Sequence, residues 1–109
     1  MQIMAERVLT FIENGTNTEQ VVRVLLGLPM LDDRGQDWLV EYEIHGPGLE
    51  RVIRRRTPGV DAVQALVMTL NVIIPAQLEN LADFAGGRIL FLKSEDLGFV
   101  ALTPDEPKQ

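Results

Sequence analysis

Cysteine is absent from the 109 residues of this chain, and histidine occurs once, at His45. The first absence excludes disulfides, thiolate nucleophiles and cysteine metal sites, and it fits a reducing compartment. The second leaves no pair of imidazoles for a histidine-rich metal centre. Hydrophobic residues make up 46% of the sequence, which is ordinary for a folded domain. We therefore expect a core held by apolar packing, with no cofactor and no metal ion.

The start of the sequence does not read as a signal peptide, and the sequence contains no long apolar run. Residues 1–7 do not combine a basic start with an apolar stretch, as a signal peptide does. No apolar run approaches the roughly 20 residues that cross a bilayer. We therefore expect a cytoplasmic protein that does not enter a membrane.

Basic residues are scarce relative to acidic ones. The sequence has 10 Lys and Arg against 16 Asp and Glu, which gives a net charge of −6. Domains that bind nucleic acid usually carry the opposite balance. Acidity favours solubility, or attraction to a basic partner. We therefore expect no nucleic-acid partner.

Apolar and β-branched segments bounded by turn residues predict four strands before any helix. They are Glu6–Glu13, Gln20–Leu28, Trp38–His45 and Leu49–Arg56. Turn residues at 14–17 (Asn-Gly-Thr-Asn) should join the first two strands as a hairpin, and Pro29 should end the second. In the third strand, period two predicts that Trp38, Val40, Tyr42 and Ile44 face the core. The alternate residues Leu39, Glu41, Glu43 and His45 should then face water for the most part.

The third and fourth strands should pair across the turn at 46–48 (Gly-Pro-Gly). The predicted partners are Tyr42 with Ile53, Glu41 with Arg54, and His45 with Glu50. Opposite charges in such pairs contribute about 0.2–1 kcal/mol each. This parity leaves Arg51 and Arg55 on the inner side, at its rim. We expect residues 57–59 (Thr-Pro-Gly) to break the strand.

An amphipathic helix is predicted from about Val60 to Leu81. Asp61 should cap it, with Gln64 completing a capping box and Val60 as the hydrophobic staple. The apolar stripe comprises Val63, Leu66, Val67, Leu70, Ile73, Ile74, Leu78 and Leu81. Pro75 either kinks the helix or opens a second one, and the unbroken phase of the stripe favours the kink.

The glycines at 86–87 should stop the helix, and two short strands should follow. These are Arg88–Lys93 and, after a turn at 94–98, Phe99–Leu102. The prediction is an α+β domain over residues 1–102. A mostly antiparallel sheet of five to six strands carries one long, Pro-kinked helix on one face, and the order is four strands, the helix, then two strands. The polar tail from Thr103 to Gln109 is expected to be disordered.

No group of residues in the sequence predicts catalysis. His45 stands alone, and an exposed strand end is its ordinary place. The arginines from Arg51 to Arg56 divide between the two faces of a strand, so they do not form one phosphate site. We therefore expect no enzyme. The candidate interaction surface is the exposed charged face that comprises Glu41, Glu43, Arg54 and Arg56.

Two neighbouring segments carry a resemblance. The strand from Trp38 to Ile44, followed by residues 58–66 (Pro-Gly-Val-Asp-Ala-Val-Gln-Ala-Leu), resembles a family of small uncharacterised bacterial domains. The resemblance implies an open sheet with a helix and no assigned activity. It carries over no catalytic residue.

The leading functional hypothesis is a non-enzymatic protein–protein interaction module. By analogy alone, an immunity-type protein that neutralises a toxin encoded beside it would have this size and charge. The alternatives are a homo-oligomeric structural domain, since Gln20–Leu28 is apolar on both sides, and a binder of small anionic ligands through the strand Arg51–Arg56.

Overall fold

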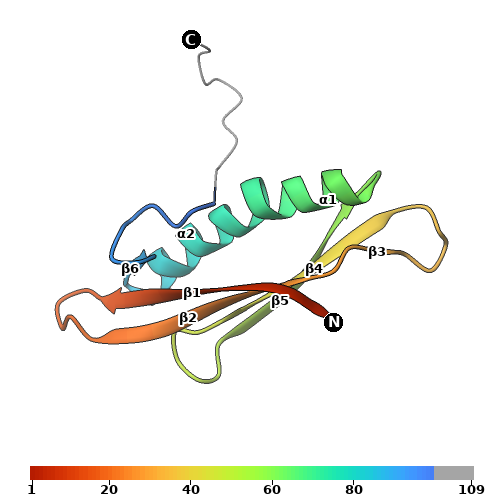
Figure 1. Cartoon of the computed structure of the whole chain (residues 1–109). Helices are drawn as coiled ribbons and strands as arrows, with labels where there is room; N and C mark the ends of the chain where they lie inside the picture. The colour runs from red at the N-terminus through yellow and green to blue at the C-terminus, as the bar shows by residue number, and fades with distance from the viewer. Residues whose placement is uncertain (100–109) are drawn as a thin grey trace, which may run out of the picture.

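The chain folds into an antiparallel sheet with one long helix across one face (Figure 1). The computed structural model describes residues 1–99. Its elements are β1 (Ile3–Glu13), β2 (Glu19–Gly27), β3 (Met30–Leu31), β4 (Trp38–His45), β5 (Val52–Gly59), α1 (Ala62–Met68), the π-helical turn η1 (Thr69–Ile73), α2 (Ile74–Ala85) and β6 (Gly87–Leu90). The predicted α+β class and the order of strands and helix are confirmed.

The six-stranded sheet runs β3-β4-β2-β1-β6, and β5 pairs with β4. The β1–β2 hairpin forms as predicted, with Leu9 opposite Val22. Because β5 pairs with the whole length of β4, β2 and β3 share the other edge of β4. Pro29 lies between β2 and β3, since a proline has no amide hydrogen to donate to the ladder.

The predicted register of β4 and β5 is wrong by two residues. Ile44, rather than Tyr42, lies opposite Ile53, while Tyr42 lies opposite Arg55. The loop between the strands is longer than the predicted turn, and it closes with the Gly46 amide donating to the Arg51 carbonyl at 2.7 Å. A shift of two keeps every side chain on its face, so the predicted parity holds.

Residues 57–59 were expected to break the strand, but β5 continues through them to Gly59. β5 pairs only with β4 among the described strands, and a proline is tolerated on such an edge strand. Gly59 also brings the sheet close to the helix. A Cβ on this glycine would lie 2.5 Å from the Ala65 nitrogen.

The helix begins at the predicted cap. The Gln64 amide donates to Asp61 Oδ1 at 2.7 Å, and the Val60 amide donates to Gln64 Oε1 at 2.8 Å. The Gln64 side chain therefore accepts the amide of Val60, the residue before the cap, and not that of the cap residue Asp61. Val60 is not a staple, because its side chain is 74% exposed.

Pro75 does not divide the helix, and it is the second residue of α2. The π turn η1 comes directly before α2, so the regular series of bonds from each amide to the carbonyl four residues earlier is already interrupted there. The helix therefore runs from Ala62 to Ala85 as one element of 24 residues. By length and composition it is apolar enough to cross a membrane, a property that core helices of sheet proteins share, and its inner side packs on the sheet. It ends at Gly86, whose φ of 78° is left-handed.

The π turn changes which side of the helix faces the sheet. The buried helix residues are Ala65, Thr69, Ile74, Leu78 and Leu81. Val63 and Val67, which the predicted stripe included, are instead 68% and 39% exposed. The small Ala65 occupies the sheet-facing position of α1, because β5 approaches the helix closely at Gly59.

The C-terminal segment returns over the inner side of β1. Strand β6 ends at Leu90, earlier than predicted, and a turn follows in which Phe91 and Ser94 form a bridge. Arg7 Nη1 donates to the Leu97 carbonyl at 3.0 Å. Of the predicted strand Phe99–Leu102, the described Phe99 is not in a strand; the remainder, and the tail from Thr103, lie outside the described residues.

Candidate functional site

The face of the sheet opposite the helix, here called the outer face, carries no helix in the part of the chain that the structure describes (Figure 1). Alternation along the strands assigns its side chains. They include Val8, Val21, Arg23, Leu25, Glu41, Glu43, His45, Arg54 and Arg56. All four residues of the predicted interaction surface therefore lie on one face.

The four predicted residues form two cross-strand pairs. Glu43 lies opposite Arg54, and Glu41 lies opposite Arg56. Arg54 Nε is 3.3 Å from Glu43 Oε2. The predicted pair of Glu41 with Arg54 is therefore wrong, because of the two-residue shift in register. The prediction that acidic and basic side chains of β4 and β5 would face one another is confirmed.

Glu43 is the centre of this cluster. His45 Nε2 lies 2.7 Å from Glu43 Oε1, so His45 contacts Glu43 rather than the expected Glu50. The hydrogen bond from His45 and the nearby Arg54 guanidinium lower the pKa of Glu43, against the opposing effect of its partial burial. Glu43 is therefore a charged carboxylate held from two sides.

The row of charges continues onto β1 and β2. Arg23 lies opposite His45, and Arg23 Nε donates to Glu6 Oε2 at 2.6 Å. This pair was not predicted. The hairpin register, had it been extended along β1 and β2, would have placed Glu6 and Arg23 on the same face. We call Glu6, Arg23, His45, Glu43, Arg54, Glu41 and Arg56 the charge ladder.

An apolar strip lies beside the charge ladder, on β1 and on β2, the strand that the sequence had marked as apolar on both sides, although Val8 and Val21 were not named as its residues. Val8 and Val21 are 53% and 58% exposed. Val8 lies opposite Arg23 and Thr10 opposite Val21, so the two valines are diagonal neighbours across β1 and β2. The run Val21-Val22-Arg23-Val24 indicated this strip, because it places valines on both faces of the strand. A single helix can cover only one of those faces.

The arginines from Arg51 to Arg56 were predicted not to form one site, and they do not converge in the structure. Arg54 contacts Glu43, and Arg55 Nη1 donates to the Arg54 carbonyl at 2.8 Å. Arg51 donates to the Pro47 carbonyl at 3.3 Å and stacks 5.1 Å from the Phe84 ring centre. Charged side chains on an edge strand also hinder pairing with another sheet edge. This role accounts for the arginines without an anion.

Within residues 1–99, no group of three His, Asp or Glu side chains is arranged to hold a metal ion. The acidic loop at 32–37 is organised by its own backbone. Asp32 Oδ1 accepts the amides of Arg34 and Gln36 at 3.1 and 2.9 Å. The Gln36 amide is the main cause of the lowered pKa of Asp32.

Comparison with known proteins identifies a family. A search of curated proteins and a search of solved structures each found no match. One family model matches residues 5–101, which is nearly the whole chain and includes every residue of the charge ladder and the apolar strip. The chain therefore belongs to the family described as a domain of unknown function, DUF6968.

Proposed function

We propose that this domain is a non-enzymatic module that binds a protein partner through the outer face of its sheet. The observation that carries the proposal is the exposure of Val8 and Val21 on a face over which residues 1–99 place no helix. A sheet face with apolar side chains is normally covered by another layer. A partner would supply that layer.

The charge ladder favours a protein surface over a small ion. Three contacts join opposite charges within it, and its three carboxylates balance its three guanidinium groups, so its net charge is near zero although the chain carries −6. Such a surface selects a partner by the pattern of its charges, and apolar burial supplies the affinity. The expected partner therefore presents an apolar patch to Val8 and Val21, with polar side chains around it.

A bacterial immunity-type role is one specific form of this proposal. It is supported by the resemblance of the Trp38 strand and the Asp61 helix start to small bacterial domains, and by analogy in size and charge. In that role the partner is a toxin, and the domain is cytoplasmic, where it would meet the toxin.

Self-association through the same face is the second candidate. The charge ladder contains acidic and basic side chains in similar number, so two copies stacked with opposite direction could pair Glu41 of one with Arg56 of the other. Anion binding by the segment Arg51–Arg56 has weaker support, because Arg51, Arg54 and Arg55 already have partners.

The test compares two valine-to-lysine variants. Val21→Lys places a charge on the apolar strip, while Val63→Lys places the same charge on α1, at a valine that is 68% exposed. Each variant is used to recover partners from the source organism, and its melting temperature is recorded. Loss of a stoichiometric partner with Val21→Lys alone supports the proposal.

Sedimentation separates the two candidates. A partner of a different sequence supports the module, and a dimer that Val21→Lys dissociates supports self-association. Equal recovery with both variants, or a wild-type protein that remains alone and monomeric at physiological concentration, contradicts both.

A further inference from the structure

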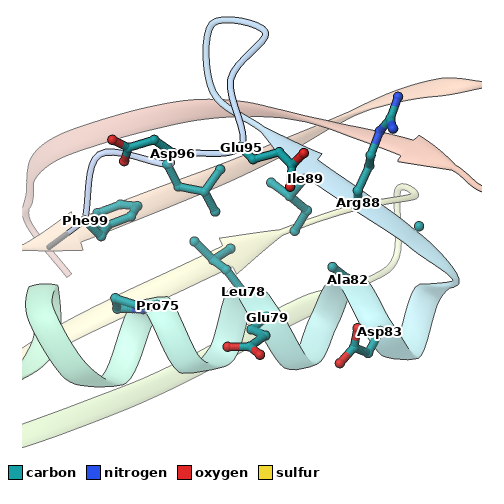
Figure 2. A pocket seen from close by; sticks show the side chains of 12 residues that line it. Pro75, Leu78, Glu79, Ala82, Asp83, Arg88, Ile89, Glu95, Asp96 and Phe99 are labelled. Atoms are coloured by element: carbon teal, nitrogen blue, oxygen red, sulfur yellow. The ribbon is translucent and has the colours of Figure 1, made fainter. Parts of the chain in front are cut away.

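A groove of about 420 Å³ lies on the helix side of the molecule, between α2, β6 and the segment 95–99. Its floor is apolar, and Leu78, Ala82, Ile89 and Leu97 contribute to it. Figure 2 shows Leu78 and Ile89 in the space between the helix and this segment. The volume falls within the roughly 300–1,000 Å³ that is usual for binding clefts.

The rim of the groove is acidic on both walls. Glu79 and Asp83 belong to the helix, and Glu95 and Asp96 belong to the opposite segment. All four are exposed, and the ion pairs found within residues 1–99 include none of them. The basic residue at the groove, Arg88, extends away from the helix in Figure 2.

The position of Asp83 is unfavourable for the helix itself. It lies in the last turn of α2, which contains no basic residue. The C-terminal end of a helix carries partial negative charge, so a carboxylate there is repelled. A charge that weakens its own helix, at the mouth of a concave surface, is a departure from local rules of the kind found at binding sites.

The geometry points to a groove that binds a basic, extended peptide segment of a protein partner, with an apolar side chain on the floor and a lysine or arginine toward each acidic wall. Charge complementarity selects this occupant, because the lining carries four carboxylates and one guanidinium. The inference does not rest on the function proposed for the outer face, since the groove lies in the other layer.

Three synthetic peptides test the occupant with the full chain. They are the amidated sequences Lys-Leu-Lys-Leu-Lys, Lys-Gly-Lys-Gly-Lys and Glu-Leu-Glu-Leu-Glu, each with a fluorescent label for anisotropy. We expect measurable affinity for the first alone. Affinity should fall as salt rises, because exposed charges are screened. Equal binding of the first two would show attraction to net charge only, and would overturn the proposal.

Matched variants test whether the peptide binds in the groove. Glu79→Gln with Asp96→Asn removes one charge from each wall, and we expect about fivefold weaker binding or more. Asp33→Asn with Glu50→Gln removes the same charge from exposed loops beyond the sheet and should leave binding unchanged. Ala82→Leu fills the floor while it preserves helix propensity, and should also weaken binding.

Three further outcomes would contradict the inference. They are an equal loss in the control pair, no loss in the groove pair, and a self-association that the groove pair abolishes, which would make the occupant a second copy. Melting curves establish that each variant is folded. The outer-face variant Val21→Lys should bind the peptide normally, so failure of either proposal leaves the other testable.

Discussion

The Ile74 amide donates to the carbonyl of Thr69, five residues earlier, rather than to that of Leu70. Thr69 and Ile74 are successive fully buried residues of the helix, while Leu70 and Ile73 between them are only partly buried. An α-helix returns to the same face after three or four residues, and here the step is five. The apolar stripe after η1 is therefore out of phase with the one before it.

Two truncations in the predicted stripe should have very different effects. Leu78→Ala should cost about 2–5 kcal/mol of unfolding free energy, because Leu78 is 1% exposed and its loss leaves a cavity. Val63→Ala should cost about 0.5 kcal/mol or less, because its side chain is in water. Urea unfolding measures both. Similar losses would mean that the helix keeps one phase throughout.

The cap of the helix should contribute measurably to stability. Asp61→Ala removes the oxygen that accepts the Gln64 amide, and we expect a loss of about 1 kcal/mol. For a domain of this size that corresponds to about 4–8 °C in melting temperature. The control is Asp33→Ala, in an exposed loop, which should change the melting temperature little.

Glu43 should make stability depend on pH in the acid range. Its folded-state pKa is lowered by His45 and Arg54, so the ionised carboxylate stabilises the fold above its unfolded pKa. That contribution is lost as the pH falls through the folded pKa. Glu43→Gln should therefore be less stable than wild type at pH 7, by about 1 kcal/mol or less, and the difference should shrink as the pH falls through the folded pKa and vanish below it.

The matched substitution for that experiment is Glu50→Gln, at an exposed carboxylate. Denaturant unfolding at a series of pH values should show no such convergence for it. A Glu43→Gln difference that persists unchanged in acid would show that the carboxylate's charge is not the cause.

Gly59 should not tolerate a side chain. A Cβ there would lie 2.5 Å from the Ala65 nitrogen and 2.8 Å from its Cα, and backbone atoms cannot rotate away. We expect Gly59→Ala to destabilise the protein by about 1–3 kcal/mol, as overpacking does. Thermal unfolding measures the loss. No change in melting temperature would mean that α1 lies farther from β5.

The outer face and the groove differ in how far the sequence could reveal them. The period-two pattern placed Glu41, Glu43, Arg54 and Arg56 on one face, because parity survives a register error of two. The groove could not be predicted, since its walls, α2 and the segment 95–99, come together only when that segment returns over β1 beside Arg7.

Local features of the sequence determined the α+β class, the β1–β2 hairpin, the Asp61 cap and which residues of each strand share a face. Each of these depends on residues close together in the chain. The tertiary structure alone decided the β4–β5 register, the π turn before Pro75, and the exposure of Val63 and Val67. A periodic pattern states which side chains share a face. It does not state how far one strand slides along another, nor how closely Gly59 lets the sheet approach Ala65.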